Sequence, residues 1–207
     1  MAERVFFAGV VPACGASTRM GQDKGLMEVG GRSFLRRTID ALAEGGCDPV
    51  LVVVAEGEQA LATEASAAGA VVLPNPDPGD GPITSLRIAL AGLHGSIGGV
   101  VYLPVDHPMV RPETVRLLLE EARASEPLLA IPVYGGKRGH PAVFSNALFP
   151  ELLDPTLEGG AKTVVHRHLR DALLVDVADE GVVTDIDTPD AYEAVLESGR
   201  RHSGGPR

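Results

Sequence analysis

A loop of small residues that also carries two cations follows the first apolar run of the chain. Residues 11–24 read V-P-A-C-G-A-S-T-R-M-G-Q-D-K. Small side chains from Ala13 to Ser17 let backbone N–H groups approach an anion closely, and Arg19 and Lys24 add fixed positive charge. A triphosphate needs this combination. The loop fits neither the Walker-A pattern nor the G-x-G-x-x-G fingerprint, so an ordinary surface turn with two solvated cations is an open alternative.

Two aspartates from distant segments have the chemistry to share a metal ion. Asp106 follows a strand-like run between two prolines, and Asp187 stands in the segment T-D-I-D-T-P. A carboxylate facing a phosphate needs a cation between them, and Mg²⁺ commonly uses one or two carboxylates plus substrate phosphates. Asp106 is too far upstream of the next helix to cap it. Thr188 and Pro189 suit the start of a helix, which leaves Asp187 unexplained by capping. We therefore expect the two aspartates to form one Mg²⁺ site.

A glycine-rich basic loop, Gly135–Pro141, lies between two apolar segments and reads G-G-K-R-G-H-P. Two interpretations are open: it binds an anionic acceptor, or it is a hairpin turn that is basic by chance. Cys14 has no partnering base in the sequence, so we interpret it as a small buried thiol rather than a nucleophile. The histidines without metal-ligand spacing are interpreted as surface residues: His94, His166, His168 and His202.

Strand-like and helical patterns alternate along the chain. Short β-branched apolar runs predict strands at residues 5–11, 50–55, 71–73, 100–103 and 128–133. Helical patterns predict helices at residues 33–44, 58–68, 83–94 and 113–124, with a further helix after Thr188. Ser33 suits the N-cap of the first helix. Strands that are apolar on both faces and separated by helices indicate a parallel sheet covered on both sides.

Three loops that follow predicted strands, at residues 12–25, 74–84 and 104–109, contain most of these candidates. Ligands of parallel α/β sheets bind beyond the carboxyl ends of the strands. We therefore expect the three loops to open onto one crevice, with the cationic loop facing Asp106.

Composition and charge limit the classes of function. The chain has 207 residues, of which 44% are hydrophobic, and we expect one domain over residues 1–197 followed by a flexible tail at 198–207. No apolar run approaches the roughly 20 residues that cross a bilayer, and the start of the chain lacks a signal-peptide layout, so we expect a cytoplasmic protein without a membrane partner. The net charge of −10 argues against a nucleic-acid polymer as partner. The two cysteines are too few for a disulfide framework.

Four motifs in order give the chain a resemblance to a known family. Residues 11–24 resemble the signature A-x-G-x-S-x-R-M-G-x-x-K of the MobA-like nucleotidyltransferases. Within that family the chain is most similar to the molybdenum cofactor cytidylyltransferases. The motifs typical of that branch are matched by Asn75–Asp77 with Thr84–Leu86, by Gly139–Pro141 and by Asp185–Pro189. The resemblance runs from about residue 5 to residue 196.

The resemblance implies a three-layer α/β/α, Rossmann-like nucleotidyltransferase fold with a mostly parallel sheet. It implies Mg²⁺-dependent transfer of a nucleoside monophosphate, CMP from CTP as the first expectation, to a phosphorylated acceptor of the molybdopterin type. Three sets of site residues follow from it: Lys24, Arg19 and Asp106 for catalysis; Ala13, Cys14, Gly15, Ser17, Asn75, Gly81, Ser85 and His140 for binding; and Asp106 and Asp187 for the metal. A molybdoenzyme is the implied protein partner, and the chain is expected to be a monomer or a homodimer.

Some residues depart from the cytidylyltransferase pattern and keep alternatives open. Cys14 replaces a usual Ala or Gly, while Asp23-Lys24 and Gly81-Pro82 are typical of the guanylyltransferase branch, which uses GTP. A sugar-phosphate nucleotidyltransferase is a second alternative, and a non-catalytic accessory protein that delivers the cofactor is a third. A nicotinamide-dependent oxidoreductase lacks support because its glycine fingerprint is absent.

Overall fold

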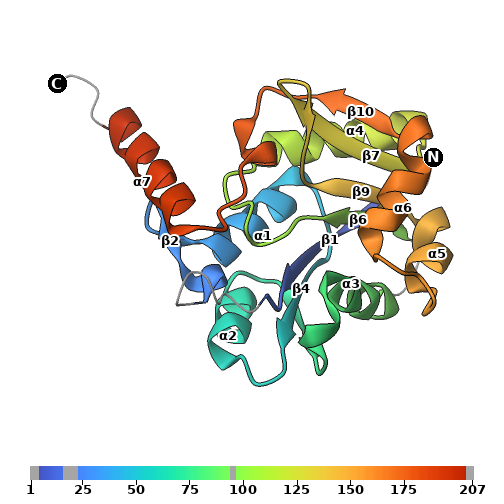
Figure 1. Ribbon diagram of the computed structural model, residues 1–207, viewed down its shortest axis with the longest axis horizontal. Helices are drawn as coiled ribbons and strands as arrows, with labels where there is room; N and C mark the ends of the chain where they lie inside the picture. Colours follow the sequence, from blue (N-terminus) through green and yellow to red (C-terminus); the bar gives the residue numbers. More distant parts are fainter. Residues whose placement is uncertain (1–4, 16–22, 94–96, 204–207) are drawn as a thin grey trace.

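The computed structural model describes residues 5–15, 23–93 and 97–203 of the chain. Its centre is an eight-stranded sheet with the order β10-β7-β9-β6-β1-β4-β5, and β8 pairs with β7 (Figure 1). The strands of this sheet are β1 (Phe6–Ala13), β4 (Val50–Ala55), β5 (Val71–Asn75), β6 (Ile97–Tyr102), β7 (Leu129–Tyr134), β8 (Lys137–Arg138), β9 (Ala142–Ser145) and β10 (Leu173–Asp176). A separate hairpin consists of β2 (Glu28–Val29) and β3 (Arg32–Ser33).

The sheet is mostly parallel, as the sequence predicts. Strand β1 runs parallel to β4 and β6, β4 runs parallel to β5, and β7 runs parallel to β10. The exceptions are β9, which is antiparallel to both β6 and β7, and the short β8, which is antiparallel to β7. The carboxyl ends of β5, β4, β1 and β6 therefore lie along one edge of the sheet, where the start of β9 also lies.

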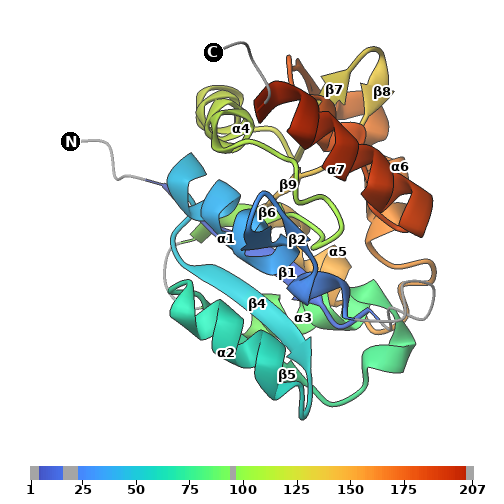
Figure 2. The same cartoon turned by 90° about the vertical axis from the view of Figure 1, so that its left-hand side faces the viewer.

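Helices cover both faces of the sheet and complete the three predicted layers (Figures 1 and 2). The α-helices are α1 (Phe34–Gly45), α2 (Gln59–Ala67), α3 (Pro82–Ala91), α4 (Pro112–Ser125), α5 (Phe149–Leu153), α6 (Ala161–His168) and α7 (Pro189–Ser203). The described residues also form five 3-10 turns: η1 (Lys24–Leu26), η2 (Pro78–Asp80), η3 (Asn146–Leu148), η4 (Leu169–Asp171) and η5 (Glu180–Val183).

Alternating side chains of the strands divide the core into two clusters. On one face Val11 and Val52 pack with apolar residues of α1, α2 and α4. On the other face Val10 and Val53 pack with apolar residues of α3, α5 and α6. Because successive strand residues point to opposite faces, a strand that is buried on both faces must be apolar throughout. This is why the runs at β1 and β4 lack the polar alternation of a half-exposed strand.

A third, smaller cluster joins the C-terminal helix to the β2–β3 hairpin rather than to the sheet. Met27, Val29 and Phe34 pack against Ile186 and Val195. The Tyr192 hydroxyl donates a hydrogen bond of 2.7 Å to the Glu28 carbonyl oxygen. Helix α7 therefore lies beside β2 and the start of α1 (Figure 1).

The predicted starts of two helices are confirmed. Ser33 Oγ accepts a hydrogen bond of 3.0 Å from the Arg36 N–H at the start of α1. Thr188 Oγ1 accepts one of 3.3 Å from the Ala191 N–H at the start of α7. Helix α7 itself continues to Ser203, and the domain boundary expected at residue 197 stays a prediction. Within the described residues, none of the helices combines the length and apolar character that a membrane crossing requires.

Candidate functional site

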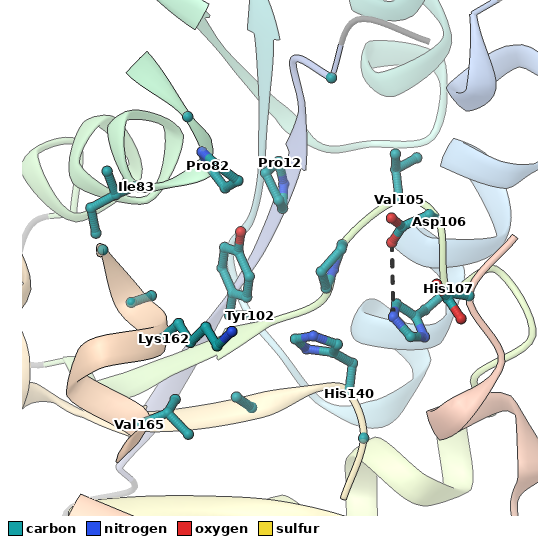
Figure 3. Close-up of a pocket in the computed structure, with 18 of the residues that line it drawn as sticks. Pro12, Pro82, Ile83, Tyr102, Val105, Asp106, His107, His140, Lys162 and Val165 are labelled. Carbon is teal, nitrogen blue, oxygen red and sulfur yellow. Dashed lines mark ion pairs between the residues drawn. The ribbon is translucent and has the colours of Figure 1, made fainter. Parts of the chain in front are cut away.

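A cavity of about 1400 Å³ lies at the carboxyl ends of β1 and β6 (Figure 3). All three predicted loops contribute to its wall, with Pro12–Gly15 and Asp23–Gly25 from the first, Gly81 from the second and Pro104–His107 from the third. The prediction of one shared crevice is therefore confirmed. Its volume exceeds the roughly 300–1,000 Å³ of ordinary small-molecule pockets.

At one end of the cavity the first loop meets the segment before α7. Lys24 Nζ donates to Asp187 Oδ1 in an ion pair between residues separated by 163 positions in the sequence. The Ile186 N–H donates a hydrogen bond of 2.9 Å to the Asp106 carbonyl oxygen. These two contacts bring Lys24, Asp106 and Asp187 together from three segments. The described residues that line the cavity include Lys24 and Asp185 but not Asp187.

The Asp106 carboxylate is partly buried and poorly compensated. Its Oδ1 is enclosed and has no hydrogen-bond partner among the described residues, and His107 Nε2 lies 3.9 Å away, beyond hydrogen-bond range. Burial raises the pKa of Asp106. The nearby His107 opposes that rise, the negative charge of Asp187 adds to it, and Lys24 opposes it. The described residues around Asp106 therefore do not fully compensate the negative charge of its carboxylate.

These residues fit a divalent cation. Mg²⁺ and Mn²⁺ prefer carboxylate and phosphate oxygens, and Asp106 supplies an enclosed oxygen without a hydrogen-bond partner next to a second carboxylate, Asp187. In the part of the chain that is described, no group of three His, Cys, Asp or Glu side chains is arranged to hold a metal. A cation bound by the two aspartates would thus need further oxygen ligands from a substrate, which is the usual arrangement for Mg²⁺ with nucleotides.

The predicted nucleotide-binding residues divide into those that line the cavity and those that shape its wall. Ala13, Cys14, Gly15 and Gly81 line it. Gly81 has φ 89°, a conformation that favours glycine. Ser17 and Arg19 lie outside the described residues.

Asn75 and Ser85 lie behind the wall and are each only 1% exposed. Asn75 Nδ2 donates to Thr84 Oγ1 at 3.1 Å and to Ser85 Oγ at 3.2 Å. Its Oδ1 accepts a hydrogen bond of 3.0 Å from the Asp77 N–H. The amide therefore holds the turn between β5 and α3 in place, and a direct contact with nucleotide does not follow from its position.

Cys14 behaves as the small thiol that the sequence predicts. Its Sγ donates to the Val53 carbonyl oxygen at 3.2 Å. Burial raises the pKa of the thiol, and hydrogen bonds with Ser85 and Asn75 partly offset that rise. A thiol with a raised pKa is a poor nucleophile at neutral pH.

The basic loop is a hairpin turn that also lines the cavity, and its contact with an anionic acceptor stays a prediction. Gly135 and Gly136 have φ 55° and 77° and join β7 to β8, which suits a two-residue turn that needs positive φ at both positions. Gly139 then packs so closely against η5 that an added Cβ would lie 2.0 Å from the Val182 carbonyl oxygen. Residues Gly136–His140 line the cavity.

The rings of His107, His140 and Tyr102 form a row at the cavity wall (Figure 3). The rings of His107 and His140 are 4.8 Å apart, and those of His140 and Tyr102 are 6.2 Å apart. Burial, and secondarily the positive potential of His107, lowers the pKa of His140 to about 4. His140 is therefore neutral near pH 7. His107 has no predicted role, although its place directly after Asp106 was a signal available for one.

Cationic side chains gather in the cavity wall despite the net charge of −10. Those lining it are Lys24, Arg87, Lys137, Arg138 and Lys162. Figure 3 shows Lys162 pointing into the cavity from α6, and no pattern in the sequence had indicated it. His166, interpreted from sequence as a surface residue, is exposed and also lines the cavity rim.

Known proteins resemble this chain over most of its length. The family described as "MobA-like NTP transferase domain" matches residues 9–172. A molybdenum cofactor guanylyltransferase of Rhizobium leguminosarum bv. trifolii is 37% identical, over 81% of this chain and 74% of that protein. A probable molybdenum cofactor guanylyltransferase of Pelotomaculum thermopropionicum is 30% identical, over 61% of this chain and 57% of that protein. The nicotine blue oxidoreductase of Paenarthrobacter nicotinovorans is 29% identical, over 91% of this chain and 95% of that protein.

A solved structure resembles the whole described fold. The crystal structure of Rv0371C from Mycobacterium tuberculosis H37Rv in complex with manganese superposes with a TM-score of 0.76 and 30% sequence identity, covering 94% of this chain and all of that one. The family match ends at residue 172, so the segment that carries Asp187 lies beyond it. The likeness to Rv0371C covers nearly the entire chain.

Proposed function

The chain belongs to the MobA-like NTP transferase domain family, and from that premise we propose that it transfers GMP from GTP to a phosphorylated acceptor of the molybdopterin type, with release of pyrophosphate. Guanine replaces the cytosine first expected, because curated relatives at 30% and 37% identity are named molybdenum cofactor guanylyltransferases. The Asp23-Lys24 and Gly81-Pro82 pairs had already indicated this alternative.

The observation that carries the proposal is the meeting of Lys24, Asp106 and Asp187 at one end of a cavity of about 1400 Å³. Nucleotide and acceptor are both anions, so their approach requires positive charge between them. Lys24 supplies one such charge, and the two aspartates would hold a divalent cation. When bound, that cation would neutralise phosphate charge and align the reactants. A manganese complex of a structural relative supports the divalent requirement, and Mg²⁺ is our proposal for the ion.

The proposed chemistry asks little of a general base. The second pKa of a phosphate monoester is near 6, so the acceptor phosphate is mostly dianionic at neutral pH. One of its oxygens attacks the α-phosphorus, a new P–O bond forms, and the bond from the α-phosphorus to the bridging oxygen breaks as pyrophosphate leaves. The chain contributes positioning and charge, as in other phosphoryl transfers. Accordingly, the thiol of Cys14 and the neutral ring of His140 need not move a proton.

The acceptor is proposed to occupy the end of the cavity away from Lys24. The cavity lining includes the apolar and aromatic residues Ile83, Tyr102, Ile131, Phe144 and Val165. Three cations stand on its wall: Lys137, Arg138 and Lys162. A flat organic body with an attached phosphate suits an apolar floor with cations around it. The predicted contact of His140 with the acceptor belongs to this part of the proposal.

Pyrophosphate release tests the proposed reaction. GTP and CTP would each be supplied with molybdopterin or with a sugar 1-phosphate, in Mg²⁺ and in Mn²⁺. We expect release with GTP and molybdopterin at a rate well above every other pair. Absence of release with all pairs would reject the reaction, and a preference for CTP would reject the base. Because one relative is named an oxidoreductase, NADH and NADPH oxidation would be followed in parallel, and we expect none.

A further inference from the structure

The carboxylate of Asp179 lies outside the cavity and joins two segments that carry cavity residues. Asp179 stands between β10 and η5, and it is only 3% exposed. It is not among the described residues that line the cavity. An acidic side chain is rarely buried to this extent unless its oxygens are paired or hydrogen-bonded. The partners of Asp179 therefore show which parts of the fold this carboxylate holds together.

Both carboxylate oxygens have partners in α4 and η5. Oδ2 accepts hydrogen bonds of 2.9 Å from the Arg111 N–H and of 2.6 Å from the Thr114 hydroxyl, at the start of α4. Oδ1 accepts one of 3.1 Å from the Gly181 N–H in η5 and lies 3.3 Å from Arg111 Nε. The side chain of Arg111, the N-cap residue of α4, makes no capping hydrogen bond of its own. Asp179 thus anchors this end of α4 from another segment, and the helix dipole favours a carboxylate there.

The anchored end of α4 is also the end of the loop that carries Asp106. This loop, residues 104–111, begins where β6 ends and stops where α4 starts. Gly181 of η5 packs against it so closely that an added Cβ would lie 2.2 Å from the Met109 carbonyl oxygen. A shift of η5 or of the start of α4 should therefore displace Asp106.

The same turn, η5, supports the basic loop. The His140 N–H donates a hydrogen bond of 2.8 Å to the Val182 carbonyl oxygen. A few residues later the chain reaches Ile186, whose N–H donates one of 2.9 Å to the Asp106 carbonyl oxygen. Asp179 is thus a common anchor of the segments that present Asp106 and His140 to the cavity.

We propose that Asp179 is a positioning residue for the reaction, which fixes the loop of Asp106 relative to the loop of His140 so that nucleotide and acceptor meet in a reactive geometry. This inference rests on the proposed function, in which Asp106 serves the metal and the nucleotide and His140 contacts the acceptor. A misplacement of about 1 Å between reacting groups can cost about 10²-fold in rate. An anchor that sets the relative position of the two loops should therefore affect turnover without touching either reactant.

Two variants weaken the anchor by different amounts, and a matched variant controls for stability. Asp179→Asn keeps the size of the side chain and removes its charge. Thr114→Val keeps the shape of a buried threonine and removes its hydrogen bond to Asp179. The control is Thr38→Val, which removes the hydrogen bond of 2.7 Å from another buried threonine to the Phe34 carbonyl oxygen. Thr38 lies in α1, a helix without cavity-lining residues. Thermal melts by circular dichroism would check that each protein is folded.

The first measurement needs no turnover and follows the His140 ring by NMR. The chain has six histidines, and the signal that disappears in His140→Gln belongs to His140. In wild type, burial of this ring lowers its pKa to about 4. Loss of support at η5 should admit water to the ring. We therefore expect the pKa of His140 to rise toward its ordinary value in Asp179→Asn and by a smaller amount in Thr114→Val, and to keep its wild-type value in Thr38→Val.

Steady-state kinetics measure the effect on the reaction. The kcat should fall about 10²-fold in Asp179→Asn and about tenfold in Thr114→Val, while the KM for GTP stays within about twofold of wild type. Thr38→Val should keep the wild-type kcat even where its Tm falls as far as that of Thr114→Val. A purely structural role predicts a different pattern, in which all three variants lose stability and the folded proteins keep both kcat and the pKa of His140.

A wild-type kcat in both Asp179→Asn and Thr114→Val would overturn the inference, as would an unchanged pKa of His140 in both or equal changes in Thr38→Val. If Asp179→Asn does not fold, Thr114→Val decides. If wild type releases no pyrophosphate with any pair of reactants, the proposed reaction fails, and the NMR titration alone decides whether Asp179 positions the basic loop. If wild type releases pyrophosphate and the variants behave like it, only the inference fails.

Discussion

Replacing Asp106 by asparagine should change stability and activity in opposite directions. The Asp106 carboxylate has an enclosed oxygen without a hydrogen-bond partner among the described residues, and it interacts unfavourably with Asp187. Burial raises its pKa, which means that the ionised form is disfavoured in the ligand-free fold. Asparagine keeps the shape and removes the charge. The ligand-free protein should therefore gain stability from a change that removes a proposed metal ligand.

The size of the gain follows from the degree of burial. A buried group without a hydrogen-bond partner costs about 1–3 kcal/mol, and a charged group costs more, so the neutral amide costs less than the carboxylate. The Asp106 side chain is 27% exposed, so water reduces that cost and the lower end of the range applies. We expect the free energy of unfolding to rise by about 1 kcal/mol, which corresponds to about 2–4 °C in Tm for a chain of this length. Turnover should fall by about 10²–10³ or more, the loss typical for one preorganised charged group.

Two assays on the same preparations check both signs. Differential scanning calorimetry without metal or nucleotide gives the Tm, and pyrophosphate release with saturating GTP and acceptor gives the rate. Asp176→Asn, a change of an exposed residue at the end of β10, is the matched control and should alter neither. A wild-type rate in Asp106→Asn would remove this carboxylate from the reaction. A lower Tm would show that the ligand-free fold already compensates its charge, contrary to the reasoning above.

Three further predictions concern other parts of the site. Lys24→Ala should raise the KM for GTP or lower kcat by about 10²-fold, and unchanged steady-state kinetics would remove Lys24 from the nucleotide site. His140 has a pKa lowered from 6.5 to about 4, so the unfolded chain binds more protons between these pH values and stability is lost as pH falls through that window. Urea unfolding at several pH values should show a smaller loss for His140→Gln than for wild type, and equal losses would refute this origin. Gly139→Ala would place a Cβ 2.0 Å from the Val182 carbonyl oxygen, and chemical denaturation should show a loss of about 1–3 kcal/mol; an unchanged midpoint would mean that the loop moves freely.

Local chemistry made much of the fold predictable. Strands β1 and β4 are apolar on both faces, and only a sheet that is covered on both sides buries such strands. The starts of α1 and α7 were visible because a capping side chain acts on the next three residues. The reversed direction of β9 was not predictable in this way, since direction depends on which neighbours a strand meets.

At the site, residue type alone does not identify which side chains face the cavity. Asn75 matches a motif and is polar, and both features suit a ligand contact, but its amide is bonded within the turn before α3. Conversely, Lys162 matches no motif and lines the cavity. The pairing of Lys24 with Asp187 spans 163 positions and depends on the way α7 packs against the β2–β3 hairpin. Sequence indicated which groups have the right chemistry, and tertiary packing decided which of them meet.

The acidic surface and the anionic reactants are compatible because charge acts over short distances. At physiological ionic strength exposed charges are screened beyond about 8 Å, so a net charge of −10 spread over the chain has little influence inside the cavity. The cations in the wall line the same cavity as the proposed phosphate site, and attraction over such short distances is screened least by salt. The acidic surface repels GTP at long range and the cations of the cavity attract it at short range. Salt should therefore affect the association and the release of GTP through different charges. Added salt should speed association of GTP by screening the acidic surface, and it should also speed release by weakening Lys24. A stopped-flow titration that found salt slowing association would show that the cationic wall, rather than the net charge, governs the approach of the nucleotide.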